Sequence, residues 1–175
     1  MTDFASATVF IDGEYRYTLT RVWDDLPTIT FVLLNPSTAD ALVDDPTIRR
    51  CMGFAARNGF GGITVRNLFA FRATDPRELA TAHDPVGAHN DEYLERLRPR
   101  RSPWPRDGAD QRLEYPTVVV AWGANPAATP DRVSTVVDLM HGTPLLSLGP
   151  PTRSGAPRHP LYLAGDTPLQ TWIQP

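Results

Sequence analysis

The sequence contains no lysine and a single cysteine. All 17 basic residues are therefore arginine, and 20 acidic residues leave a net charge of −3. A chain with that charge is not, as a whole, a polycation drawn to nucleic acid. The lone Cys51 excludes an internal disulfide and a cysteine-rich zinc site, and it is typical of a protein that works in the reducing cytoplasm.

Long apolar runs are also absent. No run approaches the ~20 residues that a membrane-spanning helix needs, and the N-terminal stretch MTDFASATVF lacks the basic start of a secretory signal peptide. His83, His89 and His141 have no partners at ligand spacing, so neither a metal ion nor a cofactor is expected. We therefore expect a cytoplasmic protein without a membrane partner, folded as a single α/β domain over residues 1–175.

The segment 28–40, TITFVLLNPSTAD, organises the chain. Its apolar run, residues 29–34, is short, contains β-branched and large side chains, and stops abruptly at Asn35 and Pro36. Such a run bounded by a turn dipeptide predicts a strand buried on both faces. Because Pro36 cannot donate a hydrogen bond to a sheet, the strand has to end there, and Ser37 or Thr38 can cap a following helix. Asn35 is thus predicted at the carboxyl end of a central strand.

Strand and helix patterns alternate along the rest of the chain. Apolar strands are predicted at residues 62–67, 117–123 and 144–148, and helices at residues 46–57, 76–79, 90–97, 130–140 and 167–172. The dipeptide at residues 12–13, Asp-Gly, separates two alternating runs and predicts an N-terminal β-hairpin. We expect a three-layer α/β fold, with a central, mostly parallel four-stranded sheet, helices on both faces, and the hairpin on or beside the sheet.

One stretch, residues 98–112, differs from the rest in composition. Its sequence, RPRRSPWPRDGADQR, is rich in proline and arginine and predicts an exposed loop. Trp104 within it either stacks on a base or anchors the loop to the body of the protein.

Polar residues at the strand ends are the candidates for a functional site, because ligands of open α/β sheets bind at the carboxyl ends of the strands. The candidates are Asn35, Ser37, Thr38 and Asp40 after the first strand, Asn67 and Arg72 at the end of the second, Trp122 and Gly123 after the third, and Arg153, Arg158 and His159 in the loop after the fourth.

Several of these residues also have a purely structural interpretation. Asn35 can orient a water or read a base edge, or it can make only an Asx turn ahead of the proline. A buried Asn67 needs hydrogen-bond partners, from either a ligand or a neighbouring loop. His159, beside an arginine, is a general acid, an anion contact or a surface residue. The guanidinium groups of Arg153 and Arg158 can hold a phosphate through paired hydrogen bonds.

Five motifs together, LNPSTAD, DDPTIRRC, VRNLFAFRATDP, AWG and RHPLYL, resemble a bacterial and phage family known as a domain of unknown function. More distantly, residues 33–36 are similar to the first motif of the uracil-DNA glycosylase superfamily, Gly-x-Asn-Pro, which positions the attacking water. Residues 65–68 and 121–123 are similar to its second and third motifs. Its last motif, His-Pro-Ser, is matched only by the His-Pro pair at residues 159–160, ten residues later than expected.

This second resemblance implies a uracil-DNA-glycosylase-like fold and hydrolysis of the N-glycosidic bond of a nucleobase or modified nucleotide. Asn35 would orient water, Asn67 would read the base edge, Phe69 or Phe71 would stack on the base, and His159 and the loop arginines would meet the leaving group or a phosphate. A non-catalytic module that binds a nucleotide or nucleic acid, and an unrelated chemistry on the same scaffold, are the alternatives. The expected partner is a free nucleotide, a single strand or a duplex, and no oligomeric state is predicted.

Overall fold

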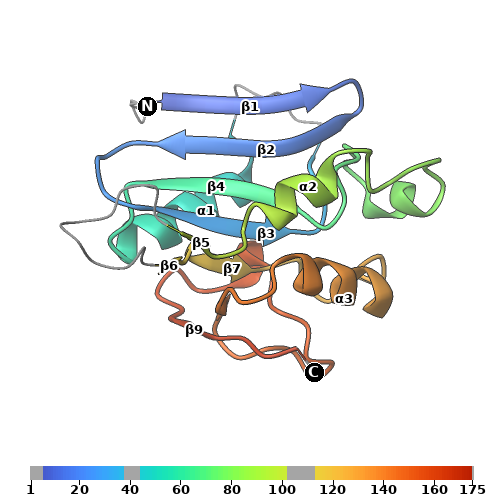
Figure 1. Cartoon of the computed structure of the whole chain (residues 1–175). Helices are drawn as coiled ribbons and strands as arrows, with labels where there is room; N and C mark the ends of the chain where they lie inside the picture. The colour runs from blue at the N-terminus through green and yellow to red at the C-terminus, as the bar shows by residue number, and fades with distance from the viewer. Residues whose placement is uncertain (1–5, 38–43, 102–112, 175) are drawn as a thin grey trace.

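The computed structural model describes residues 6–37, 44–101 and 113–174. Within these residues the main sheet has seven strands, in the spatial order β1-β2-β4-β3-β7-β8-β9 (Figure 1). The strands are β1 Ser6–Asp12, β2 Tyr15–Val22, β3 Thr28–Leu33, β4 Gly62–Asn67, β7 Val118–Val120, β8 Leu145–Leu148 and β9 Leu169–Thr171. A separate ribbon pairs β5 Arg100–Arg101 with β6 Leu113–Glu114.

The centre of the sheet is parallel and its two sides are antiparallel. Strands β4, β3, β7 and β8 run parallel to one another, whereas β2 pairs antiparallel with β4, and β9 pairs antiparallel with β8. The chain passes from β3 to β4 on one side and later crosses to β7 on the other. This reversal makes the carboxyl ends of β3 and β7 a topological switch point, where ligands bind in open α/β sheets.

Helices cover both faces of the sheet. Helix α1, Pro46–Arg57, packs behind it in Figure 1, while α2, Asn90–Glu95, and α3, Pro130–Leu139, lie in front. The side chains of β3 alternate between two cores: Ile29 and Phe31 pack with α1, and Val32 packs with the helices of the other face. A central parallel strand is therefore apolar on both faces, which explains its continuous hydrophobic run.

Helix α1 begins and ends where the sequence predicts. Asp45 caps its first turn, with Oδ1 accepting a hydrogen bond of 2.8 Å from the backbone N–H of Ile48, and Pro46 occupies the first helical position. The buried positions Ile48, Cys51 and Ala55 recur at helical spacing and form the inner face. The cap also places the Asp45 carboxylate at the carboxyl edge of the sheet.

The sheet is larger than the four strands predicted. The hairpin β1–β2 extends it, because a two-stranded hairpin alone is marginally stable and Leu19 buries its side chain beside Val65 of β4. The predicted helix at residues 167–172 is wrong: β9 pairs there with β8, and the N–H of Trp172 donates to the carbonyl of Leu145 at 2.8 Å. Six residues are too few to distinguish a helical from an extended apolar pattern.

Three smaller outcomes concern the other predicted segments. The helix at residues 76–79 is a 3₁₀-helix, η1 Pro76–Ala80, and the helix predicted at residues 90–97 ends at Glu95. A second 3₁₀-helix, η2, spans Pro160–Tyr162. Of the predicted loop 98–112, residues 102–112, which include Trp104, lie outside the described residues.

Candidate functional site

A cavity of about 560 Å³, here called the strand-end cavity, opens at the switch point. Its walls come from the ends of β3, β4 and β7, the start of α1, and the segment 152–163. Leu33 of β3 pairs in register with Asn67 of β4, so Asn35 and Asn67 reach the same edge of the sheet. The volume lies within the ~300–1,000 Å³ typical of small-molecule sites.

The structure brings together many, but not all, of the residues that the sequence nominates for a site. Those that line the strand-end cavity are Asn35, Ser37, Asn67, Trp122, Gly123, Arg158 and His159. Those described elsewhere are Phe69, Phe71, Arg72 and Arg153, while Thr38 and Asp40 lie outside the described residues.

Neither phenylalanine nominated for stacking on a base lines the cavity. Phe69 is 7% exposed and belongs to the core under α2 and α3, where the guanidinium of Arg132 lies 5.8 Å from its ring centroid. Phe71 packs edge-on against Tyr15, with ring centroids 6.2 Å apart. Both aromatic side chains therefore contribute to packing.

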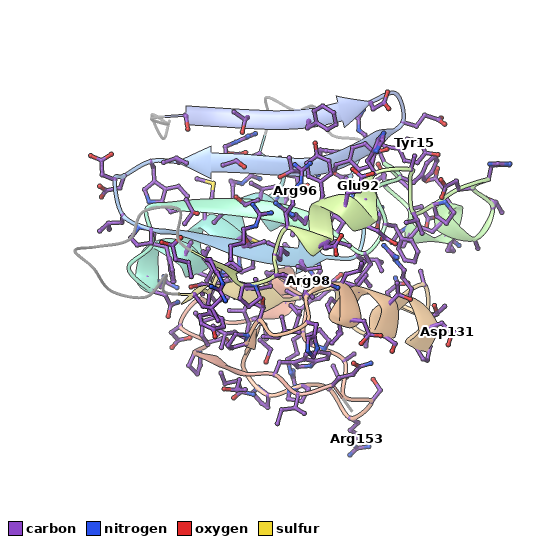
Figure 2. The ribbon with its side chains drawn as sticks, viewed as in Figure 1. Tyr15, Glu92, Arg96, Arg98, Asp131 and Arg153 are labelled. Atoms are coloured by element: carbon purple, nitrogen blue, oxygen red, sulfur yellow. The ribbon has the colours of Figure 1, made fainter. Side chains whose placement is uncertain are left out.

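The two arginines outside the cavity lie at different places. The backbone N–H of Arg72 donates to the carbonyl of Glu14 at 2.9 Å, which ties this segment to the turn of the hairpin. Arg153 is exposed and lies at the far end of the molecule from β1 (Figure 2). Of the loop arginines 153 and 158, only Arg158 lines the cavity, and its Nε donates to the carbonyl of Pro150 at 2.9 Å.

Asn35 is half-buried, and its amide is held in one orientation. Its Nδ2 donates to the carbonyl of Ala73 at 2.8 Å and to that of Pro36 at 3.0 Å. These bonds use both donors of the amide, so the side-chain oxygen is the group left for the cavity. Asn35 therefore closes a loop and also offers one fixed acceptor at the end of β3.

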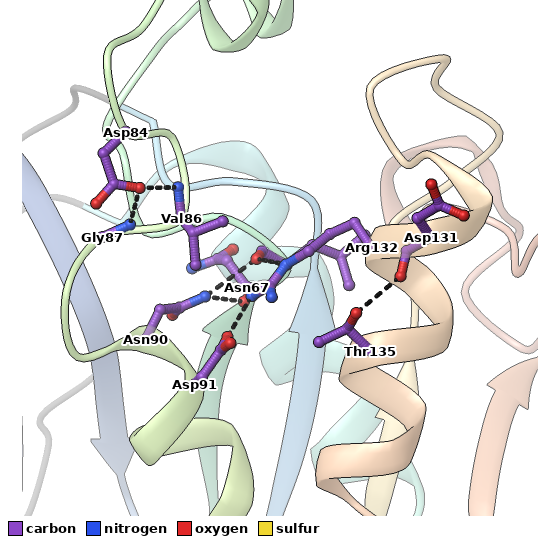
Figure 3. A network of polar contacts seen from close by, with 10 residues as sticks. Asn67, Asp84, Val86, Gly87, Asn90, Asp91, Asp131, Arg132 and Thr135 are labelled. Atoms are coloured by element: carbon purple, nitrogen blue, oxygen red, sulfur yellow. Dashed lines mark hydrogen bonds and ion pairs between the residues drawn. The ribbon is translucent and has the colours of Figure 1, made fainter.

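Asn67 is a buried amide whose side chain has no hydrogen bond within the described residues. It is 1% exposed, and its Oδ1 is fully buried and unpartnered. A neighbouring network fixes its backbone instead: Nδ2 of Asn90 donates to the carbonyls of Asn67 and Leu68, and Arg132 also donates to the Leu68 carbonyl (Figure 3). The backbone carbonyl of Asn67 thus has a hydrogen-bond partner. Its side chain, which lines the cavity, has none among the described residues.

Ser37 and Asp45 form a polar pair on the α1 side of the cavity. The Ser37 hydroxyl donates to Oδ2 of Asp45 at 2.9 Å, while Oδ1 caps α1. Both carboxylate oxygens are therefore engaged, and the pair connects the segment after β3 to the first turn of the helix.

Arg16 is a buried cation in the cavity wall. It is 5% exposed, its Nε has no hydrogen-bond partner, and no carboxylate of the described residues lies within ion-pair distance of it. Burial lowers its pKa to about 10, a change partly opposed by Asp45 and reinforced by Arg72 and Arg21. That pKa leaves Arg16 charged at neutral pH and corresponds to roughly 3 kcal/mol against the buried cation.

A β-bulge sets the position of Arg16. Phe10 pairs with Thr18 but Ile11 pairs with Arg16, so Tyr17 is an extra residue in β2. Such a bulge reverses which side chains face each side of the sheet. Tyr17 accordingly stacks on Tyr93 of α2, with ring centroids 5.5 Å apart, while Arg16 faces the cavity.

His159 approaches the cavity from the segment after β8. Its Nδ1 accepts a hydrogen bond of 3.3 Å from the N–H of Leu161, so in the neutral ring Nε2 carries the hydrogen. Burial lowers the pKa of His159, and the charge of Asp45 opposes this only in part. The ring is therefore neutral at physiological pH and offers an N–H donor to the cavity.

The pKa of His159 leads to a prediction about stability. Because the folded pKa lies below the unfolded value of ~6.5, the unfolded chain binds more protons in acid, and stability should fall as the pH drops below about 6.5. His159→Asn keeps an acceptor for the Leu161 N–H but cannot be protonated. We expect its urea midpoint between pH 8 and pH 5 to fall less than that of the wild type. Parallel curves for the two proteins would show that His159 is not held neutral.

Gly123 allows His159 to approach the end of β7. Its φ is +78°, and a Cβ at this position would lie 3.2 Å from the Cβ of His159. We expect Gly123→Ala to lower the free energy of unfolding by about 1–3 kcal/mol, through the left-handed backbone and this contact. Gly53→Ala is the control: it lies within α1 with open space around it, and should stabilise by about 0.5–1 kcal/mol. Urea denaturation of both variants tests the prediction, and equal effects would contradict it.

The cavity is also lined by residues that the sequence did not mark as candidates, among them Arg16, Asp45 and Tyr162. Tyr162 is 82% exposed at the cavity, with its ring centroid 5.7 Å from that of His159. The motif RHPLY could have indicated Tyr162, because this aromatic residue lies close in sequence to the nominated His159. Asp45 is recognisable only as a helix cap, and Arg16 only as one polar residue of a hairpin.

Several other kinds of site find no support in the part of the chain that is described. No group of three or more His, Cys, Asp and Glu side chains there could hold a metal ion. Burial raises the pKa of Cys51, so its thiol stays protonated, and it belongs to the core beneath α1. None of the described helices combines the length and the apolar character that crossing a membrane requires.

Comparison with known proteins identifies one relationship. A family model described as "Protein of unknown function (DUF1643)" matches residues 16–161. This match includes every residue of the strand-end cavity except Tyr162 and Leu163. Searches of curated proteins and of solved structures found no match.

Proposed function

The chain belongs to the DUF1643 family, whose description assigns no activity, and we propose from the geometry of its cavity that it binds a nucleobase or modified nucleotide there and hydrolyses the N-glycosidic bond. One observation carries the proposal: the side-chain oxygen of Asn67, buried in the wall of a 560 Å³ cavity, has no hydrogen-bond partner among the described residues. An unsatisfied buried amide costs about 1–3 kcal/mol. A ligand with a complementary donor and acceptor edge, such as a base, would offset that cost.

The remaining groups fit the parts of such a reaction. Two hydrogen bonds that Nδ2 of Asn35 donates to backbone carbonyls orient the amide, so its Oδ1 can accept a hydrogen bond from a water and hold it near the sugar. The Nε2–H of neutral His159 can donate to the departing base. Because Tyr162 is exposed at the cavity, we assign it the stacking role on the base that was expected of the phenylalanines.

In the hydrolysis step one bond forms and one bond breaks. The water oxygen forms a bond to C1′ of the sugar, and the bond from C1′ to the base nitrogen breaks with both electrons leaving on the base. The hydrogen bond from His159 stabilises the negative charge that develops on the base. The attacking water gives its proton to solvent and the departing base takes one up from solvent, so the products are the sugar with a hydroxyl at C1′ and the neutral base, and no other reactant is required.

The resemblance to the uracil-DNA glycosylase superfamily supports the same activity. The three motifs similar to that superfamily, at residues 33–36, 65–68 and 121–123, each contribute residues to the strand-end cavity. The displaced His-Pro pair does so too, because η2 and the segment before it fold back against the end of β7. The net charge of −3 makes a free nucleotide or a single strand as suitable a substrate as duplex DNA.

A non-catalytic nucleotide-binding module is the second candidate, and one observation favours it. Nδ2 of Asn35 bridges two backbone carbonyls, as an asparagine with a purely structural role would. In that case the cavity would bind its ligand without positioning a water.

The decisive experiment is a search for base release. Purified protein is incubated with nucleosides, nucleotides, single strands and duplexes that carry normal and modified bases, and free base is detected by mass spectrometry. Release of one base class above the uncatalysed rate supports the glycosidase. Ligand binding without release from any substrate supports the binding module, and neither binding nor release would remove both candidates.

A further inference from the structure

We infer that Arg16 is an oxyanion-binding residue, and that the ligand of the strand-end cavity carries a terminal phosphate or carboxylate that reaches this guanidinium. The inference rests on the proposed function in that it names the substrate class of the same cavity. It concerns a part of the ligand that neither base recognition nor hydrolysis requires.

Arg16 has no anionic partner among the described residues. Arg16 is 95% buried, yet its Nε has no hydrogen bond, and the described residues supply its guanidinium with no ion pair. Buried guanidinium groups are normally paired with carboxylate or phosphate, whose paired oxygens match the planar fork of N–H donors. Among the described residues, Arg16 therefore has no counter-ion of the kind that its burial calls for.

The nearby acids do not fill this role. Asp45 interacts electrostatically with Arg16, but its two oxygens accept from the N–H of Ile48 and the hydroxyl of Ser37. Asp44 is paired instead with Arg21, with 3.0 Å between Oδ1 and Nε. Both carboxylates thus have other partners, and neither lies within ion-pair distance of Arg16.

The position of the Arg16 side chain also points to a ligand in the cavity. The β-bulge at Tyr17 turns Arg16 toward the cavity, and a side chain that served only to pack would not need this local disruption of pairing. Since 5% of Arg16 remains exposed, only a group that enters the cavity can reach it. An internal phosphodiester of a duplex, flanked by sugars on both sides, does not fit that description. The substrate class is therefore a small nucleotide or a strand end with a terminal oxyanion.

Arg16 is also a better candidate than Arg158 for holding the anion. Arg158, expected from the sequence to bind phosphate, is exposed, and its Nε already donates to Pro150. An exposed arginine at the rim is screened by water and salt, whereas a buried one is not. Arg158 should guide an anionic ligand inward, and Arg16 should hold it.

The test uses inorganic phosphate as the probe, with sulfate, acetate and chloride at equal ionic strength. Thermal unfolding of the wild type should show a Tm that rises with phosphate, by roughly 5–10 °C at a hundredfold excess over its Kd. A larger response to phosphate than to acetate identifies a phosphate-bearing ligand, and the reverse order identifies a carboxylate. A wild-type Tm that responds to these anions no more than to chloride would overturn the inference.

Arg16→Met is the diagnostic variant, and Arg153→Met is the control, because Arg153 is an exposed arginine that does not line the cavity. Without added anion, Arg16→Met should be at least as stable as the wild type, because it removes a buried cation that lacks a partner. It should also lose at least tenfold in phosphate affinity, while Arg153→Met behaves as the wild type. Lower stability without anion, or an unchanged phosphate response, would show instead that Arg16 is a structural partner of Asp45.

Arg16→Lys covers the case in which the methionine variant does not fold. It keeps the charge but not the planar fork, so phosphate affinity should fall while the fold is retained. Unchanged affinity would overturn the assignment of the guanidinium. Because phosphate contains no base, its binding can succeed where base release fails, and the reverse, so failure of this inference is distinguishable from failure of the proposed function.

Discussion

Asn35→Ala is expected to lower kcat for base release by about 10²–10³-fold, the cost of losing one positioned polar group in a transition state. The Kd of the substrate should stay within about tenfold, because a water-orienting group acts mainly in the transition state. Single-turnover measurement of free base, with Kd measured separately, tests both statements. Equal loss of binding and turnover would identify Asn35 as a ligand contact.

The alanine variant also removes the two hydrogen bonds that Nδ2 donates to backbone carbonyls, here called the clamp, so a second variant is needed. Without Asn35 Nδ2, the carbonyls of Pro36 and Ala73 lose a donor, and stability should fall by about 1–3 kcal/mol. Asn35→Asp loses the same two donated bonds but keeps a side-chain acceptor at the end of β3. If Oδ1 orients the water, the aspartate variant should retain more turnover than the alanine variant at equal fraction folded. Equal turnover in the two variants would mean that the clamp alone is required.

The strand ends were the part of the site that could be predicted from the sequence. A buried parallel strand is a continuous apolar run, and Pro36 ends β3 for a local reason, so Asn35 could be placed before any tertiary contact was known. The register of β3 with β4 then brings Asn67 to the same edge. The first step required no knowledge of distant contacts, whereas the second rests on the pairing of two strands that the sequence could only suggest.

The rest of the site depends on contacts that sequence patterns do not encode. Arg16 faces the cavity only because Tyr17 is an extra residue in β2, and an alternating run does not reveal a bulge. Phe69 follows the end of β4 in the chain, yet the core under α2 and α3 buries it away from the cavity. The short strand β9 was predicted as a helix because its pairing with β8 is a tertiary contact.

A second large effect is expected for the side chain of Asn67, which has no hydrogen bond with the described residues. Asn67→Leu removes an amide whose side chain has no hydrogen bond with the described residues, so the free energy of unfolding should be unchanged or higher. Binding of a base-containing ligand should weaken by about 1–3 kcal/mol, roughly 5- to 150-fold, because its donor and acceptor edge would then face an apolar side chain. Titration calorimetry and urea denaturation on the same preparation give the two quantities.

Asn90→Leu is the matched control, since Asn90 is equally buried but its Nδ2 donates to the carbonyls of Asn67 and Leu68. Its loss leaves the Asn67 carbonyl, and one bond to Leu68, without a buried partner, so it should destabilise by about 1–3 kcal/mol. The two buried asparagines should therefore have opposite profiles, with Asn67 affecting the ligand and Asn90 the fold. If Asn67→Leu instead destabilises as Asn90→Leu does and leaves ligand binding intact, the amide is structural, and the observation that carries the glycosidase proposal is lost.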